Sequence, residues 1–257
     1  MKETFVKEKM KVKLKNPILI EGLPGLGMVG RIATRYLIKQ LKAKKLAELY
    51  SPHFPYYVHV NKKGSVRLLR GNFYFSKNHN AETDFIFLTG DSQAQTIEGQ
   101  YEVSSCILNF VSKLNTKLIV TLGGYRKEVE KKPQVVAVST NPGVLKKALQ
   151  ANALASSSGN PIVGTAGLLL GLAKFQNIDA VCLLGETRGY LPDPLAAKSV
   201  LEVLQKMLDM KMDIGDLDKE IKKSKQIVAK MREIEHRREE YARKKRKTEE
   251  ERITYIS

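Results

Sequence analysis

The sequence predicts a three-layer α/β/α sandwich around a largely parallel sheet, followed by a long helical extension. Short apolar segments bounded by turn residues alternate with segments whose apolar residues recur at helical spacing. Several apolar segments end in Gly, Asp or Glu, as buried strands of an α/β sheet do where they meet a loop. From residue 216 to residue 252 the chain is rich in charged helix formers and contains neither glycine nor proline.

The first predicted elements are a strand, a loop and a helix. Residues 5–15 alternate charged and apolar side chains, which is typical of a strand at a solvent-exposed sheet edge. Residues 18–20 predict a short buried strand, and residues 21–27 form a glycine-rich turn. The spacing of apolar residues over 28–41 predicts a helix. This order places the glycine-rich turn where α/β proteins commonly hold ligands.

The remaining body is predicted to alternate strands with helices, with Pro142 at a first helical position. Gly123 and Gly124 are interpreted as a turn. Strands are expected over residues 46–50, 56–60, 66–75, 85–91, 118–122, 135–139 and 180–186. Helices are expected over residues 101–114, 142–150, 161–175 and 195–208.

No repeat or linker interrupts residues 1–212, so we expect one domain there and a charged C-terminal helix with a docking tail over residues 213–257. Apolar residues between Ile214 and Met231 recur every three or four positions, which predicts a short coiled-coil seam. The second half of the helix is polar all round, as in a helix that projects into solvent or awaits a partner. The chain then ends in the apolar segment 253–257, which we interpret as a docking peptide.

The formal net charge of +17 is typical of proteins that bind nucleic acid, an anionic membrane surface or an acidic protein. Residues 243–247 form a basic cluster, but glutamates surround it and no aromatic platform accompanies it, which disfavours nucleic acid. The sequence has no apolar run of about 20 residues, so we expect no membrane span. Two cysteines within apolar segments and the absence of a signal-peptide pattern predict a cytoplasmic location.

One loop has the spacing of a dinucleotide-binding site. Gly25, Gly27 and Gly30 match Gly-x-Gly-x-x-Gly between a predicted strand and a helix. The acidic residue expected about 20 positions later, after a second buried strand, is missing, and so are the lysine and hydroxyl of a P-loop. We therefore favour close packing of a helix on the sheet as the reason for these glycines.

Other candidate groups are three carboxylates near strand ends and four histidines. Asp91, Glu98 and Glu186 are expected to share a cleft, although Glu186 is equally suited to an ion pair with Arg188. The histidines occur at no metal-ligand spacing. We expect no catalytic residue, no cofactor and no metal ion. The alternative is a small-molecule or nucleotide-binding enzyme that uses the loop from Gly25 to Gly30.

Five sequence blocks resemble the archaeal homologues of eukaryotic proteasome-assembly chaperones. The resemblance spans about residues 16–210, and its blocks are residues 20–30, 89–93, 122–125, 164–169 and 185–194. It implies a nucleoside-phosphorylase-like α/β/α fold without enzymatic activity. It also implies a homo-oligomeric chaperone or adaptor that assists proteasome assembly or activation. The implied partners are α subunits of the proteasome core particle, further copies of the chain and a related paralogous chaperone.

In that family the docking tail has the form hydrophobic residue, tyrosine, any residue, and its terminal carboxylate pairs with a lysine between α-ring subunits. The resemblance therefore implies docking through Ile253, Tyr255, Ile256 and Ser257. This sequence departs from the pattern because Tyr255 is third from the end instead of second. One extended residue spans about 3.3–3.6 Å, so a fixed carboxylate would displace the tyrosine ring by about that distance.

Overall fold

The computed structural model describes residues 1–78, 83–129, 132–210, 212–224 and 226–227. The chain divides into two units, Met1–Ile214 and Gly215–Ser257, which are considered separately. In the second unit, residues 217–224 are helical. Residues 228–252 of the predicted long helix, which include Val228 and Met231 of its coiled-coil seam and the basic cluster 243–247, lie outside the described residues, as does the docking tail.

Within the described part of the first unit, nine strands form one mixed sheet in the order β1-β3-β6-β7-β2-β8-β11-β9-β10. Its strands are β1 (Phe5–Glu8), β2 (Ile18–Glu21), β3 (Lys44–Tyr50), β6 (Gly71–Ser76), β7 (Phe85–Gly90), β8 (Leu118–Arg126), β9 (Val135–Ser139), β10 (Leu154–Ala155) and β11 (Asp179–Thr187). The central strands β7, β2, β8 and β11 run parallel, whereas the neighbours β6 and β9 run antiparallel to them. The sheet is therefore parallel at its centre, with antiparallel pairing on both sides of the centre and a parallel β9–β10 pair at one edge.

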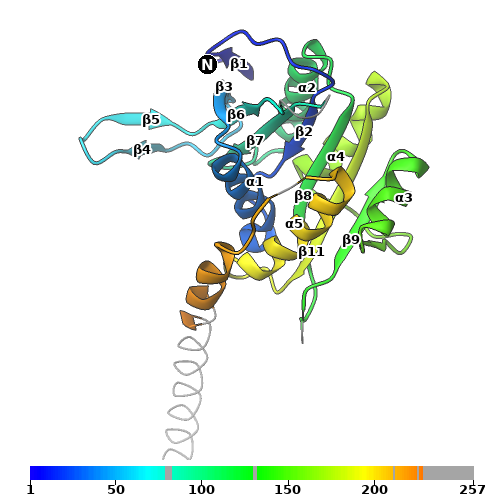
Figure 1. The fold of residues 1–257 in the computed structure, drawn as a ribbon. Coiled ribbons are helices and arrows are strands. Elements are labelled where there is room, and N and C mark those ends of the chain that lie inside the picture. The colour runs from blue at the N-terminus through cyan, green and yellow to red at the C-terminus, as the bar shows by residue number, and fades with distance from the viewer. Residues whose placement is uncertain (79–82, 130–131, 211, 225, 228–257) are drawn as a thin grey trace, which may run out of the picture. The chain divides into compact units, whose positions relative to one another are not determined.

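Helices cover both faces of the sheet, which confirms the predicted three-layer α/β/α sandwich (Figure 1). One face carries α1 (Val29–Gln40), α3 (Pro142–Gln150) and α5 (Pro194–Leu208). The other face carries α2 (Ile97–Lys113) and α4 (Thr165–Ala173). None of the described helices is long and apolar enough to cross a membrane.

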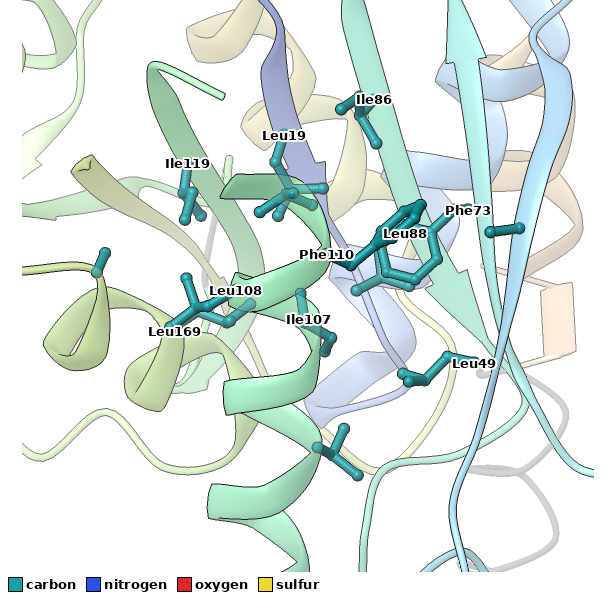
Figure 2. Packing of buried hydrophobic residues seen from close by; sticks show 14 of the residues in the cluster. Leu19, Leu49, Phe73, Ile86, Leu88, Ile107, Leu108, Phe110, Ile119 and Leu169 are labelled. Carbon is teal, nitrogen blue, oxygen red and sulfur yellow. The ribbon is translucent and has the colours of Figure 1, made fainter. Parts of the chain in front are cut away.

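Alternation along the central strands divides their side chains between the two helical layers. Leu19, Ile86 and Ile119 lie in adjacent strands and pack with Ile107 and Leu108 of α2 (Figure 2). Each of these five side chains is at most 1% exposed. Full burial of such a side chain stabilises a fold by about 1.5–3 kcal/mol, so this cluster fixes α2 against the sheet.

Side-chain caps determine where three of the helices begin. The Thr96 hydroxyl accepts a hydrogen bond from the Gly99 N–H at 3.0 Å, so α2 starts at Ile97, four residues before the predicted start at residue 101. Asn141 caps α3, which begins at Pro142 as predicted. Asp193 caps α5 in the same way.

Further predicted elements have different limits in the structure, and the strand predicted over 5–15 ends at Glu8. The strand predicted over 66–75 is two strands, β5 (Val66–Leu68) and β6, because the buried Leu69 and the following Arg70 lead the chain from a hairpin into the main sheet. The predicted turn at Gly123 and Gly124 is wrong, because β8 continues through both residues and pairs with β11 as far as Thr187. The helix predicted from residue 161 begins at Thr165, after Gly164 with φ 87°.

Candidate functional site

The carboxyl ends of the four central parallel strands meet at one edge of the sheet, where open α/β folds form ligand crevices. Glu21 ends β2, and Thr187 ends β11. The loops that follow these two strands, residues 22–28 and 188–193, contain most of the glycine-rich sequence.

The glycines of the first loop are enclosed by protein atoms. A β-carbon on Gly27 would lie 2.6 Å from Oγ1 of Thr187, and one on Gly30 would overlap the carbonyl oxygen of Leu122. Gly27 also has a φ of 58°, a conformation that glycine adopts without steric cost. The spacing of these glycines therefore serves close packing of the loop and α1 on the sheet, which supports the packing interpretation over a dinucleotide site.

The loop after β2 and the loop after β11 hold one another. The Asp193 N–H donates a hydrogen bond to the carbonyl oxygen of Gly27 at 2.8 Å. The Thr187 hydroxyl donates to Oδ2 of Asp193 at 2.8 Å and accepts from the Gly189 N–H at 3.2 Å. Asp193 thus caps α5 with one carboxylate oxygen and binds Thr187 with the other.

A side-chain amide connects this pair of loops to the opposite helical layer. Nε2 of Gln93 donates to the carbonyl oxygen of Pro24 at 2.7 Å, and Oε1 of Gln93 accepts from the Thr165 N–H at 3.0 Å. A β-carbon on Gly124 would lie 2.7 Å from the carbonyl oxygen of Leu26. The five sequence blocks named above therefore meet at this edge of the sheet.

Glu186 is buried near this edge and joins neighbouring segments through its hydrogen bonds. Oε1 accepts hydrogen bonds from the Tyr125 hydroxyl at 2.8 Å and from Nζ of Lys127 at 2.6 Å, and Oε2 accepts the Gln134 N–H at 2.9 Å. Burial alone would raise the pKa of Glu186. The three hydrogen-bond donors lower it by more, so its pKa lies below the ordinary value. The expected ion pair with Arg188 is wrong, because the Arg188 side chain contacts Glu128 at 2.9 Å.

The three carboxylates expected to share a cleft lie apart from one another, so that expectation is wrong. Asp91 follows β7 and binds the Arg67 guanidinium, while Glu186 in β11 binds the groups described above. Strands β2 and β8 lie between them, which corresponds to roughly 14 Å at ordinary strand spacing. Glu98 is exposed in the first turn of α2. The described residues contain no group of three or more acidic, histidine or cysteine side chains suited to a metal ion.

Glu21 is the most unusual titratable group at the edge. Its side chain is buried, Oε1 accepts the Leu23 N–H at 2.8 Å, and Oε2 has no hydrogen-bond partner among the described residues. Burial raises its pKa to about 7, although the hydrogen bond from Leu23 opposes the shift. Thr121 and Cys182 continue the same cross-strand row, and burial raises the pKa of the Cys182 thiol to about 12. This row is closed to solvent.

The exposed part of the edge is aromatic, aliphatic and basic. Leu26 is 40% exposed and Tyr190 is 77% exposed. The Arg126 guanidinium lies 5.0 Å from the centre of the Tyr190 ring. We call these three residues the loop surface. Tyrosine and arginine are enriched among the residues that dominate the energy of protein interfaces, so this surface is suited to protein binding.

The structure places the remaining candidates in peripheral roles or does not describe them. His53 pairs with Glu102 at 3.0 Å, and His59 lies 3.8 Å from Asp91. His79, His236 and the predicted docking residues lie outside the described residues. Sequence reasoning missed Gln93 and Tyr190 as individual residues, although both fall inside the resembling blocks.

Two solved structures from Pyrococcus furiosus are similar to this chain. PbaB, an archaeal proteasome activator, is 38% identical with a TM-score of 0.86, over 90% of this chain and 100% of that one. PbaA, an archaeal homologue of proteasome-assembly chaperone, is 27% identical with a TM-score of 0.74, over 96% of this chain and 98% of that one.

The chain is also similar to the uncharacterized protein MJ1210 of Methanocaldococcus jannaschii. The two are 34% identical over 244 residues, which cover 95% of this chain and 93% of the relative. The model of the PAC2 family matches residues 19–232. This match includes nearly the whole sheet and all five blocks, and it confirms the resemblance to archaeal proteasome-assembly chaperone homologues. The chain belongs to the PAC2 family.

Proposed function

We propose that this chain is an oligomeric, non-enzymatic chaperone or adaptor that binds the proteasome core particle or its α subunits. It assists proteasome assembly or activation in the cytoplasm, partly through its C-terminal tail. The observation that carries the proposal is the likeness to PbaB over nearly the whole of both chains. A related paralogous chaperone is a second proposed partner, because PbaA and PbaB are two such proteins of one organism.

The chemistry of the strand ends supports a binding role. Gly27 and Gly30 contact protein atoms in the positions where a dinucleotide site would need open backbone. The donors around Glu186 are all used to hold β8 and the segment before β9 in place. What the edge presents to a partner is the loop surface, which resembles the centre of a protein interface.

The proposed docking residues are Ile253, Tyr255, Ile256 and Ser257. They follow the charged segment 216–252 in the sequence. A carboxylate that pairs with a lysine between α-ring subunits would place Tyr255 about 3.3–3.6 Å from the position that the family pattern gives its tyrosine. Removing Ser257 restores that spacing, so this single deletion separates the role of the spacing from the role of the tail.

The experiment measures capture of purified proteasome α subunits by the full chain, by a chain ending at Arg252, and by a chain lacking only Ser257. We expect the full chain to capture the subunits and the chain ending at Arg252 to lose at least 90% of the signal. The chain lacking Ser257 is expected to capture them as well as the full chain or better. A Tyr255→Ala variant is the matched control for loss of the ring with the length unchanged.

Two results would contradict parts of the proposal. Equal capture by the full chain and by the chain ending at Arg252 would remove the tail from the mechanism and leave the loop surface as the site to test. If none of the four proteins captured α subunits or the assembled core particle, the proposed partner would be wrong.

A further inference from the structure

The hairpin of β4 (Val58–Val60) and β5 (Val66–Leu68) extends away from the main sheet (Figure 1). In the described part of the chain, its two strands pair only with each other. Its turn is well defined, because Oδ1 of Asn61 accepts the Lys63 N–H at 2.9 Å and the Ser65 N–H at 3.0 Å. A lone two-stranded hairpin is at best marginally stable in water, so this one requires support from other contacts.

One face of the hairpin is tied to the body by charge. His59 and Arg67 are cross-strand partners. The Arg67 guanidinium donates to both carboxylate oxygens of Asp91, at 2.5 and 3.1 Å, and Nε2 of His59 lies 3.8 Å from Asp91. The Arg70 N–H donates to the same carboxylate at 3.1 Å. The polar face of the hairpin is therefore directed to the end of β7.

The other face is aliphatic and open to solvent. Val58 pairs with Leu68 and Val60 pairs with Val66, on either side of the His59–Arg67 pair. Because side chains alternate along a strand, these four lie together on the face opposite Arg67. They are between 44% and 67% exposed. A solvated ribbon ordinarily packs its apolar face on the body, whereas this hairpin contacts Asp91 with its polar face and leaves its aliphatic face exposed.

We propose that this aliphatic face, formed by Val58, Val60, Val66 and Leu68 and called the hairpin face, packs against the same face of a second copy of the chain. The face carries no charge and no hydrogen-bonding side chain, so it selects a flat and uncharged partner surface. A second copy supplies such a surface. An isologous contact uses the same patch on both copies, and two such uncharged faces bring no like charges together.

The size of the face fits the centre of such an interface. Its four side chains, which are 44–67% exposed, form the apolar centre of an interface whose standard size is about 800 Å² per partner. The lysines at the tip set the orientation. Antiparallel stacking separates Lys62 and Lys63 of one copy from those of the other, whereas parallel stacking would bring four ammonium groups together.

This inference deepens the oligomeric state proposed above and rests on it, but it does not depend on the proteasome as the partner. The experiment measures the mass of the full-length chain in solution across a range of concentrations, by light scattering or native mass spectrometry. The variants are Val60→Asp and the double variant Val60→Thr with Val66→Thr. Threonine keeps the β-branched shape of valine, so the double variant preserves the hairpin and removes only apolar contact. Val163→Asp is the control, because it places a carboxylate on a valine that is 85% exposed and lies outside the hairpin.

We expect the wild-type chain and Val163→Asp to form the same oligomer. Val60→Asp is expected to give a smaller species at every concentration tested. The double threonine variant is expected to raise the dissociation constant at least tenfold. An unchanged mass for Val60→Asp would overturn the hairpin face as the contact while leaving the oligomer intact. A monomeric wild-type chain would overturn the inference and the proposed oligomeric state together, and would leave the capture of α subunits to be judged separately.

Discussion

At the scale of single residues, Glu21 makes the stability of the fold depend on pH. Its carboxyl group ends β2 inside the protein, with one oxygen bound to the Leu23 N–H and the other without a partner among the described residues. Burial raises its pKa from the ordinary value of 4.5 to about 7. Between those two values the folded chain holds this proton more tightly than the unfolded chain does. The contribution of Glu21 to stability is therefore fully present below pH 4.5 and is lost as the pH rises through about 7.

Replacing Glu21 with Gln is expected to remove this dependence, because the amide does not ionise and its oxygen still accepts the Leu23 N–H. Between pH 5 and pH 8.5, the free energy of unfolding of the wild-type chain should fall by about 2–3 kcal/mol more than that of Glu21→Gln. Urea unfolding of both proteins at the two pH values measures the difference. Glu98→Gln, which removes an exposed carboxylate, serves as the control. Parallel pH profiles for wild type and Glu21→Gln would show that Glu21 stays ionised in the folded state.

At the scale of elements, the close approach of α1 to the sheet depends on one missing side chain. A β-carbon on Gly30 would overlap the Leu122 carbonyl oxygen, which belongs to β8 and cannot move aside as a flexible side chain would. Gly30→Ala is expected to destabilise the fold by about 3 kcal/mol and to lower Tm by roughly 6–12 °C.

Gly171 provides the matched control for this substitution. It lies in α4, and a β-carbon placed on it meets no atom within 4 Å. Gly171→Ala should therefore raise stability by about 0.5–1 kcal/mol, through helix propensity and loss of freedom in the unfolded chain. Thermal melting of both variants is the measurement. A loss of stability in Gly30→Ala no larger than about 1 kcal/mol would mean that α1 can shift away from β8.

The elements that local sequence determines were predicted well. Strands such as β9 and helices with a cap or a proline at the start, such as α3, have the expected limits because their signals lie within a few residues. The extension of β8 through Gly123 and Gly124 was missed, since it results from pairing with β11, which is distant in sequence. The separation of β5 from β6 was missed for the same reason, because it depends on the contact between Arg67 and Asp91.

The sequence identified the segments that form the candidate site but did not predict how their residues contact one another. The blocks contain every residue that builds the edge, but their spacing does not reveal that Gln93 joins Pro24 to Thr165. The expected cleft of Asp91, Glu98 and Glu186 failed because position at a strand end does not fix the distance across a sheet. Two strands, β2 and β8, separate Asp91 from Glu186, and each carboxylate has its own cationic partner.

At the scale of the whole molecule, the net charge of +17 and an uncharged contact surface have opposite effects on association. Chains of like charge repel, and salt screens this repulsion while leaving apolar contact intact. Raising the ionic strength from about 50 mM to about 500 mM is therefore expected to lower the dissociation constant of the oligomer severalfold. Sedimentation or light scattering in the two buffers measures it. Dissociation at high salt would mean that ion pairs hold the copies together and would count against the hairpin face.

The contact between the polar face of the β4–β5 hairpin and Asp91 also has a consequence for sequence divergence among related proteins. Neither strand contributes a buried side chain to the main core, and Asp91 receives the bonds that tie the polar face to the body. Changes at Val58, Val60, Val66 or Leu68 would therefore leave the sandwich intact and, through the proposed contact, would alter which copies fit together. Two paralogues in one cell would then sort into separate assemblies by mismatch of a few aliphatic side chains, without any change in the edge that the family shares.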